Sequence, residues 1–348
     1  MLAAVTDGPD PGDGRELAAG VRAGDRRSLA RAITLVESTH PEQRPHAITL
    51  LDDLLPATGK SARVAISGPP GVGKSTLIEA LGGHLIREGH KVAVLAIDPS
   101  STRSGGSILG DKTRMELLAR EPDAYIRPSP SSGALGGVAR RTREAMLVCE
   151  AAGFDVVLIE TVGVGQSEVE VDAMVDTFVL LVAAGGGDEL QGIKRGVMEM
   201  ADVVAVTKAD GDLLAPARQA ASDYRHALHL MRPKHESWAP EVVLLSAAKG
   251  EGIGDLWSAV ERHRDTLSST GALERRRAEQ ARAWLWAEVR DQVLDRVHGD
   301  ATVRALVPDI EAAVTEGRLA PEAGARRLLD AVTRESVTGA ARGPADPA

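Results

Sequence analysis

The sequence predicts an α/β fold whose mostly parallel sheet is covered by helices on both faces. Apolar runs of strand length alternate along the chain with segments in which apolar residues recur at helical spacing. A glycine-rich loop, Gly68 to Ser75, lies between the first of these strands and a helical pattern. Because parallel neighbours need a long crossover between them, this alternation favours helices that pack back on the sheet.

Helical patterns precede the sheet. Residues 1–14 are rich in glycine, proline and aspartate, and we expect them to form a disordered tail. Between residues 15 and 58 the apolar positions recur at helical intervals, with interruptions near Pro41 and Pro45. We therefore expect an N-terminal helical extension ahead of the sheet.

The strand-like runs begin after this extension, and a purely helical pattern follows them. Strands are expected at residues 63–67, 92–97, 156–159, 178–182, 203–206 and 242–245. From Glu274 to Glu335 the pattern is helical only, and a second loose tail follows at 338–348. A helical tail that buries little surface by itself is often a dimerisation element. A helix hairpin packed on the chain's own sheet explains the pattern equally well.

The glycine-rich loop fits the pattern G-x-x-x-x-G-K-[ST] at every constrained position. Its glycines let backbone N–H groups turn inward around phosphate oxygens, Lys74 reaches the β and γ phosphates, and the Ser75 hydroxyl can ligate Mg²⁺. Thr76 stands where a dinucleotide-binding fingerprint needs its third glycine, so that alternative fails. The residues expected to hold a nucleoside triphosphate are Gly68, Pro69, Pro70, Gly71, Val72, Gly73, Lys74, Ser75 and Thr76.

Acidic residues follow two predicted strands and one glycine-rich segment. Asp98 ends the strand-like run that begins at Val92, Glu160 ends the run that begins at Val156, and Asp111 lies in a glycine-rich segment between them. The carboxyl ends of parallel strands form the crevice where open α/β sheets bind ligands. With Ser75, these three carboxylates are the candidate Mg²⁺ ligands.

Two further glycine-rich loops are candidates for catalysis. The loop after Glu160 brings Gly163, whose N–H can approach a γ-phosphate, and Gln166, which can orient water or contact a partner. Loops of this kind order when the γ-phosphate is present. The loop from Gly185 leads to Lys194, which either meets phosphate charge or lies at a solvated helix start.

A Lys-x-Asp triplet ends the predicted strand at 203–206. One carboxylate can accept both the N1–H and the N2–H₂ groups of guanine, so Asp210 is expected to select GTP. The aliphatic stem of Lys208 is expected along the purine face, and Ser246, Ala247 and Ala248 are expected beside guanine O6.

Composition narrows the choice of partners and compartment. The formal net charge is −9 and aromatic residues make up 2% of the chain, which argues against a nucleic-acid partner. The single cysteine, Cys149, excludes a disulfide framework and favours a reducing compartment, so we expect a cytoplasmic protein. No apolar run has the length of a membrane span, and no membrane partner is expected.

Five motifs of the sequence resemble those of a known family. The phosphate loop, Ile97 to Ser101, Gly106 to Arg114, Glu160 to Glu168 and Gly187 to Lys194 resemble those of the MeaB/MMAA (ArgK-type) GTPases, chaperones of methylmalonyl-CoA mutase. The resemblance covers about Leu17 to Thr333.

The resemblance implies a P-loop GTPase of the signal-recognition and nickel-maturation class. It implies a GTPase domain at 59–270 between the helical extension and a C-terminal dimerisation arm at 271–337. It also implies Mg²⁺-dependent hydrolysis of GTP to GDP by a homodimer. The partner would be an adenosylcobalamin-dependent acyl-CoA mutase, which the protein loads with cofactor and protects or reactivates.

One residue departs from the family pattern. Thr207 stands where the family usually has asparagine, so the amide that ties this loop to the phosphate loop is lost. We expect reduced GTP affinity or selectivity, although Asp210 should still favour GTP over ATP.

Two other functions compete with this interpretation. A nickel-type metallochaperone needs clustered ligands; His226, His229 and His235 lie in or near one predicted helix, but no cysteine accompanies them, so we expect surface histidines. A kinase or ATPase linked to amino-acid transport needs an acceptor site with a base, and the sequence offers no clear candidate.

Overall fold

The structure is a computed structural model that describes residues 14–98, 115–130, 135–161, 167–183 and 195–340. The chain divides into two compact units, Met1–Gln280 and Ala281–Ala348. The first contains the sheet and most of the helices, and the second contains the C-terminal helices. Within the described part of the chain, no helix is both long and apolar enough to cross a membrane.

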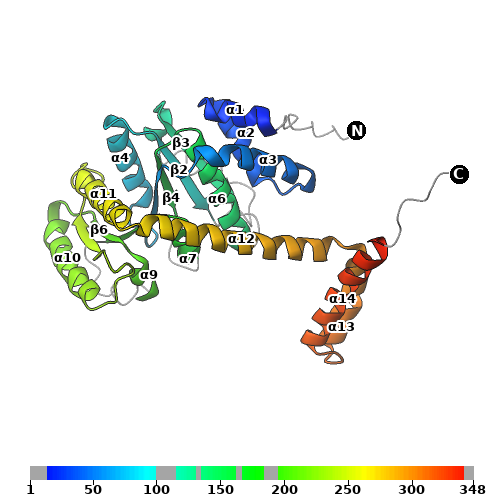
Figure 1. The fold of residues 1–348 in the computed structure, drawn as a ribbon. Helices are drawn as coiled ribbons and strands as arrows, with labels where there is room; N and C mark the ends of the chain where they lie inside the picture. The colour runs from blue at the N-terminus through cyan, green and yellow to red at the C-terminus, as the bar shows by residue number, and fades with distance from the viewer. Residues whose placement is uncertain (1–13, 99–114, 131–134, 162–166, 184–194, 341–348) are drawn as a thin grey trace, which may run out of the picture. The chain divides into compact units, whose positions relative to one another are not determined.

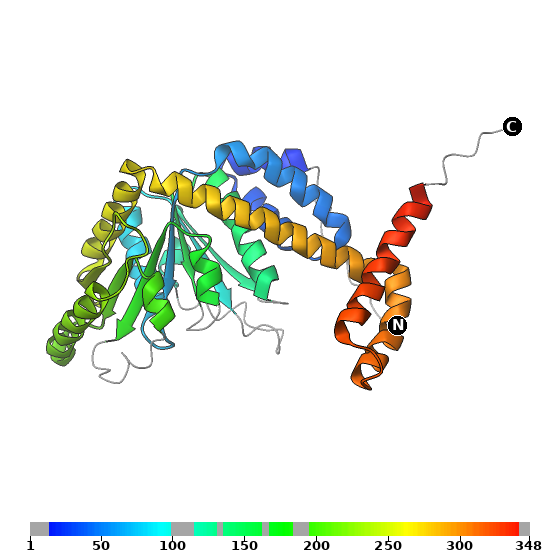
Figure 2. The same ribbon diagram turned by 60° about the horizontal axis from the view of Figure 1, so that its bottom comes forward.

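Seven described strands form one parallel sheet in the order β3-β2-β4-β1-β5-β6-β7 (Figures 1 and 2). Every described pairing between neighbours is parallel, so all carboxyl ends lie along one edge. The strands are β1 (Ala62–Ser67), β2 (Val92–Asp98), β3 (Ala124–Pro130), β4 (Val156–Glu160), β5 (Thr177–Ala183), β6 (Val203–Thr207) and β7 (Glu241–Leu244).

The edge strand β3 was missed by the sequence analysis. Its sequence includes Pro128 and Pro130, and proline cannot donate a hydrogen bond to a neighbouring strand. At the edge of a sheet only one side needs partners, and among the described strands β3 pairs with β2 alone. The six predicted strands are all present, and the predicted α/β fold with a parallel sheet is confirmed.

Helices cover both faces of the sheet. The sheet helices of the first unit are α4 (Lys74–Arg87), α6 (Leu135–Ala151), α7 (Ser167–Asp172), α9 (Arg195–Met200), α10 (Leu214–His229) and α11 (Ile253–Ser269). Leu81 of α4 and Val260 of α11 share one buried cluster with Val64 and Ile66 of β1. Because side chains alternate along a strand, Arg63 points to the opposite face, where it pairs with Glu150 of α6.

Three helices precede the sheet: α1 (Gly14–Arg22), α2 (Arg26–Glu37) and α3 (Arg44–Leu54). They pack on one another and on α6. Arg44 donates to Glu144 of α6 at 2.8 Å, and Arg127 of β3 pairs with Glu37 of α2. Short 3-10 helices lie at Pro41–Gln43, Leu55–Ala57, Leu118–Arg120 and Gly211–Leu213.

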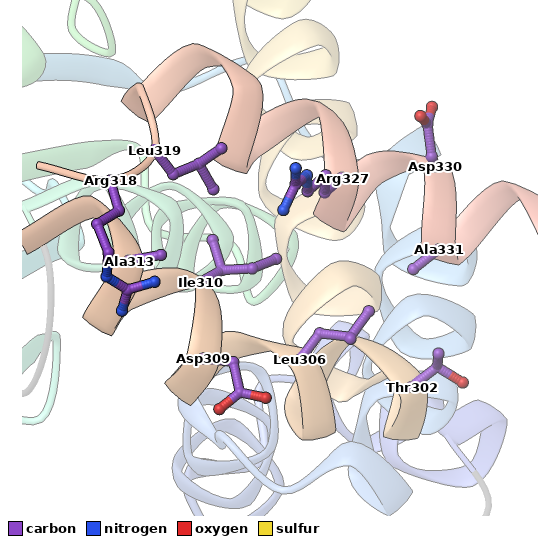
Figure 3. Close-up of a pocket in the computed structure, with 10 residues that line it drawn as sticks. All are labelled: Thr302, Leu306, Asp309, Ile310, Ala313, Arg318, Leu319, Arg327, Asp330 and Ala331. Carbon is purple, nitrogen blue, oxygen red and sulfur yellow. The ribbon is translucent and has the colours of Figure 1, made fainter.

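The C-terminal helices are α12 (Ala272–Gly299), α13 (Ala301–Thr315) and α14 (Pro321–Ala340). The first turns of α12 belong to the first unit, where Arg277 pairs with Asp176 and Gln280 donates to Val175 O at 2.9 Å. In the second unit, α13 packs on α14 and a cavity of about 740 Å³ lies between them. Leu306, Ile310 and Leu319 extend into this space (Figure 3).

Candidate functional site

The phosphate loop connects the carboxyl end of β1 to the first residue of α4. Gly68, Gly71 and Gly73 have φ angles of 150°, 78° and 104°, a region that side chains other than glycine rarely adopt. A Cβ on Gly68 would also lie 2.6 Å from the carbonyl oxygen of Leu181 in β5. The loop therefore needs glycine at these positions, and α4 begins at Lys74 as predicted.

The Lys74 side chain folds back onto the phosphate loop. Its Nζ donates to the carbonyl oxygens of Gly68 at 2.7 Å and Pro69 at 3.2 Å, and the residue is 9% exposed. Burial lowers the pKa of Lys74, while the charges of Glu160 and Glu168 act in the opposite direction. The ammonium group is thus held at the loop with two carboxylates nearby.

Ser75 and Glu160 meet at the carboxyl edge of the sheet. The Ser75 hydroxyl donates to Glu160 Oε1 at 2.8 Å, and Glu160 is 8% exposed at the end of β4, opposite Ile66 of β1. The next residue, Thr161, donates its hydroxyl to Ser67 Oγ at 2.9 Å. A hydroxyl and a carboxylate are hard oxygen ligands of the kind that Mg²⁺ takes, so this donor set fits the ion.

Several candidate residues are not described. Asp98 is the last residue of β2, and nothing is described of its side chain. Asp111, Gly163, Gln166 and Lys194 lie outside the described residues. Their predicted roles therefore remain predictions.

The Lys-x-Asp triplet lies beside the phosphate loop, at the carboxyl end of β6. Lys208 has a φ of 56° and its Nζ donates to Gly71 O at 3.0 Å. Asp210 accepts a hydrogen bond from the Ser246 hydroxyl, so the two predicted base-binding segments contact each other. Ala247 and Ala248 follow in the turn after Ser246.

The loss of the asparagine amide at Thr207 does not separate its loop from the phosphate loop. Thr207 is 3% exposed, and its hydroxyl lies 2.8 Å from Val72 O in the phosphate loop and 3.2 Å from Val182 O. The hydroxyl replaces the missing amide with a hydrogen bond of its own. The sequence did not reveal this contact because the two residues are 135 positions apart.

Replacing Thr207 by valine tests this contact. The substitution preserves the shape of the side chain but removes the hydroxyl, so a buried carbonyl loses its donor. A net hydrogen-bond contribution of about 0.5–1.5 kcal/mol corresponds to a roughly 2- to 12-fold weaker GTP affinity if the contact orders the loop. Isothermal titration measures the change, and Thr34→Val, which removes an exposed hydroxyl on α2, is the control. Unchanged affinity in Thr207→Val would contradict the role.

Two further outcomes concern residues that the sequence analysis misjudged. Glu168, in α7, is fully buried, and its charge acts to raise the pKa of Lys74, although it was not a candidate site residue. Its position at the end of the glycine-rich loop could have indicated this role.

The histidines gave a mixed outcome. His226 and His229 are exposed on α10 as expected, but His235 is not a surface histidine, because its side chain is 15% exposed and faces Asp202.

The fold and the site together define a P-loop nucleotide-binding protein of the GTPase class. The model of the family described as "Methylmalonyl Co-A mutase-associated GTPase MeaB" matches residues 29–302. The chain belongs to the MeaB family, and it is a GTPase.

Relatives and a solved structure agree with this assignment. A Mycobacterium tuberculosis protein described as a probable GTPase is 57% identical over 330 residues, which cover 95% of this chain and 97% of that protein. The mouse "methylmalonic aciduria type A homolog, mitochondrial" is 49% identical over 322 residues, 90% of this chain and 78% of the mouse protein. A solved structure described as a LAO/AO transport system kinase has a TM-score of 0.72 and 39% identity, covering 95% of this chain and 100% of that one.

Proposed function

We propose that this GTPase is a chaperone of an adenosylcobalamin-dependent acyl-CoA mutase, with methylmalonyl-CoA mutase as its partner. It gates the loading of adenosylcobalamin through GTP hydrolysis and protects or reactivates the mutase. The observation that carries the proposal is the family match over residues 29–302, a range that contains every residue of the candidate nucleotide site. The family description names association with this mutase, and the mouse relative's name refers to methylmalonic aciduria.

The nucleotide site supports specific roles for its residues. The phosphate loop and Lys74 bind the phosphates, and Asp210 with Ser246 reads the guanine. Ser75 and Glu160, joined by Asp98 and Asp111, hold Mg²⁺, which neutralises phosphate charge when bound. Gly163, Gln166 and Lys194 act on the γ-phosphate and the attacking water from the two glycine-rich loops. The contact of Ser75 with Glu160 and the loop geometry around Lys74 support these assignments.

Complex formation with the mutase tests the function. We expect the chain to co-elute with methylmalonyl-CoA mutase in size-exclusion chromatography to a different extent with GDP and with a non-hydrolysable GTP analogue. Hydrolysis should be slow for the chain alone and faster with the mutase. Loading of adenosylcobalamin into apo-mutase, followed by the visible absorbance of the cofactor, should require hydrolysable GTP. The absence of any nucleotide-dependent complex would contradict the proposal.

A phosphoryl-transfer reaction is the second candidate, because the matched solved structure is described as a kinase. Incubation with γ-labelled GTP and candidate acceptors distinguishes the two. We expect inorganic phosphate as the sole labelled product, and a labelled acceptor would favour the kinase.

We also propose that the chain forms a homodimer through α12. Four side chains of this helix, Leu285, Trp286, Val289 and Val293, are 60%, 66%, 41% and 49% exposed. At about 100° of rotation per residue they fall within one stripe roughly 100° wide. An apolar stripe on a soluble helix is the kind of surface that a second copy covers.

The dimer proposal predicts that Trp286→Glu produces a monomer. The substitution removes an aromatic side chain from the apolar stripe and places a charge there. Loss of an aromatic anchor from an interface costs about 2 kcal/mol or more, or roughly 30-fold in affinity. Light scattering after size-exclusion chromatography gives the mass. Leu230→Glu is the control, because Leu230 is 86% exposed at the end of α10 and outside the stripe. A dimer that persists in Trp286→Glu would show that α12 is not the interface.

We also propose that the protein is cytoplasmic and that it has no nucleic-acid partner, and composition supports both proposals. The one cysteine, Cys149, is a buried free thiol, which agrees with a reducing cytoplasmic environment. The net charge of −9 gives no attraction to nucleic acids.

A further inference from the structure

Three residues from separate elements converge at the amino edge of the sheet, opposite the nucleotide site. Asp202 directly precedes β6, His235 lies in the segment after α10, and His263 lies in α11. Because all the described strands are parallel, the start of β6 lies at the far edge from the carboxyl ends that carry the phosphate loop and Asp210.

The three side chains face one another without forming hydrogen bonds between them. Asp202 Oδ1 lies 3.7 Å from His235 Nε2 and 3.6 Å from His263 Nε2, and the three atoms are all within 4.8 Å of one another. These distances are too long for hydrogen bonds. Among the described residues, none of the three atoms has a hydrogen-bond partner, and Asp202 and His263 are 1% and 0% exposed.

The remaining polar atoms of the two buried residues are engaged, and this orients the group. Asp202 Oδ2 accepts from Lys234 Nζ at 2.9 Å and from the Phe178 N–H at 2.8 Å. His263 Nδ1 lies 2.8 Å from Thr177 Oγ1. Such outer contacts fix the rotation of a carboxylate or an imidazole, as they do around metal ligands. Oδ1 and the two Nε2 atoms are the polar atoms of the cluster that these contacts leave unused, and they lie within 4.8 Å of one another.

Two cations, Lys234 and Arg276, and a second carboxylate, Asp172, lie beside the cluster. Lys234 Nζ also contacts Asp172 Oδ1 at 2.7 Å, and Arg276 pairs with the same Asp172 oxygen at 3.0 Å. Burial lowers the pKa of His263 to about 4 and also lowers the pKa of His235, in each case against the charge of Asp202. Histidine ligates metals in its neutral form.

We propose that Asp202, His235 and His263 form a binding site for a divalent transition-metal ion of the zinc class. Two imidazole nitrogens and one carboxylate oxygen are a ligand set that Zn²⁺ takes, and imidazole also suits nickel and iron. Ligands at about 2.0–2.1 Å from a tetrahedral ion lie roughly 3.3–3.4 Å apart. The two separations from Asp202 Oδ1, 3.6 and 3.7 Å, are close to this spacing, and the two Nε2 atoms lie within 4.8 Å of each other.

All three donor atoms are buried, although the His235 side chain as a whole is 15% exposed. The ion would link β6, α11 and the segment that contains His235, three parts of the chain that are distant in sequence. This proposal is independent of the proposed partner and of the Mg²⁺ site, because it uses none of their residues.

Titration of the full-length chain with zinc chloride tests the site. The protein is first dialysed against a chelator and then studied without nucleotide or Mg²⁺. We expect saturable binding of one Zn²⁺ per chain by isothermal titration. His235→Ala should weaken the affinity by about 10- to 100-fold or more. His229→Ala is the matched control, because His229 is an exposed histidine on α10, and its affinity should equal that of the wild type.

Two further measurements test whether His235→Ala is folded and whether the wild-type chain binds a metal at this site. His235→Ala should hydrolyse GTP with Mg²⁺ at the wild-type rate, which shows that it is folded. Cobalt added to the wild-type chain should give the intense visible absorption of a tetrahedral site with nitrogen ligands, a readout that needs no variant. Equal zinc affinity in wild type and His235→Ala, or the absence of both saturable binding and the cobalt absorption, would overturn the proposal and leave a polar cluster without a metal.

Discussion

Lys74→Ala is expected to reduce GTP hydrolysis by about 10²- to 10³-fold, the effect of removing one preorganised group that stabilises developing charge. The structure supports a large effect for two reasons. The ammonium is buried at the loop, where its charge is poorly screened, and its Nζ holds the carbonyl oxygens of Gly68 and Pro69. Alanine removes both the phosphate contact and the group that shapes the loop.

Phosphate release under saturating GTP and Mg²⁺ measures this effect, with nucleotide affinity from titration. Lys91→Ala is a suitable control, because Lys91 is exposed and directly precedes β2, at the amino edge of the sheet. Circular dichroism during heating would show whether the variant is folded. Turnover in Lys74→Ala that stays within a few-fold of the wild type would refute the assignment of the phosphate loop.

Asp210→Asn is expected to move the nucleotide preference from GTP towards xanthosine triphosphate. The carboxylate can accept from both N1–H and N2–H₂ of guanine, whereas the asparagine amide offers one acceptor and a donor. Xanthine carries an oxygen in place of the guanine amino group, so it matches that donor. A bidentate pair is worth about 1–3 kcal/mol of discrimination, or roughly 5- to 150-fold.

Competition titrations with GTP, ATP and xanthosine triphosphate measure the change. In the wild type GTP should outcompete ATP, since Asp210 is retained and is positioned by the Ser246 hydroxyl. Asp212→Asn is the control, because Asp212 is exposed two residues further along the chain. If Asp210→Asn still prefers GTP to xanthosine triphosphate, Asp210 does not read the base.

Local patterns made much of the fold and of the nucleotide site predictable. The phosphate loop depends on glycines and a lysine within eight consecutive positions, so their spacing alone indicates the turn and the start of α4. The buried strands β4 and β6 are apolar up to their last residue because helices cover both of their faces. β3 was missed because its prolines are tolerated only where one side of the strand is unpaired.

Contacts between distant segments were not predictable from the sequence. The Thr207 hydroxyl replaces an amide only because β6 ends beside the phosphate loop. Likewise, His235 and His263 are single histidines in separate segments, and no spacing rule connects them to Asp202. Each of these contacts depends on which strands are neighbours in the sheet, and the sequence alone does not show that order.

The ion pair between Arg63 and Glu150 limits which substitutions related sequences can accept at these two positions. Arg63 Nε and Nη2 donate to the two carboxylate oxygens of Glu150 at 2.7 and 2.9 Å, and both side chains are almost completely buried between β1 and α6. Loss of one partner leaves an uncompensated buried charge, which typically costs about 3–5 kcal/mol, whereas replacement of both by apolar residues is often neutral. We therefore expect substitutions at these two positions, 87 residues apart, to be coupled, so that related chains keep both charges or lose both.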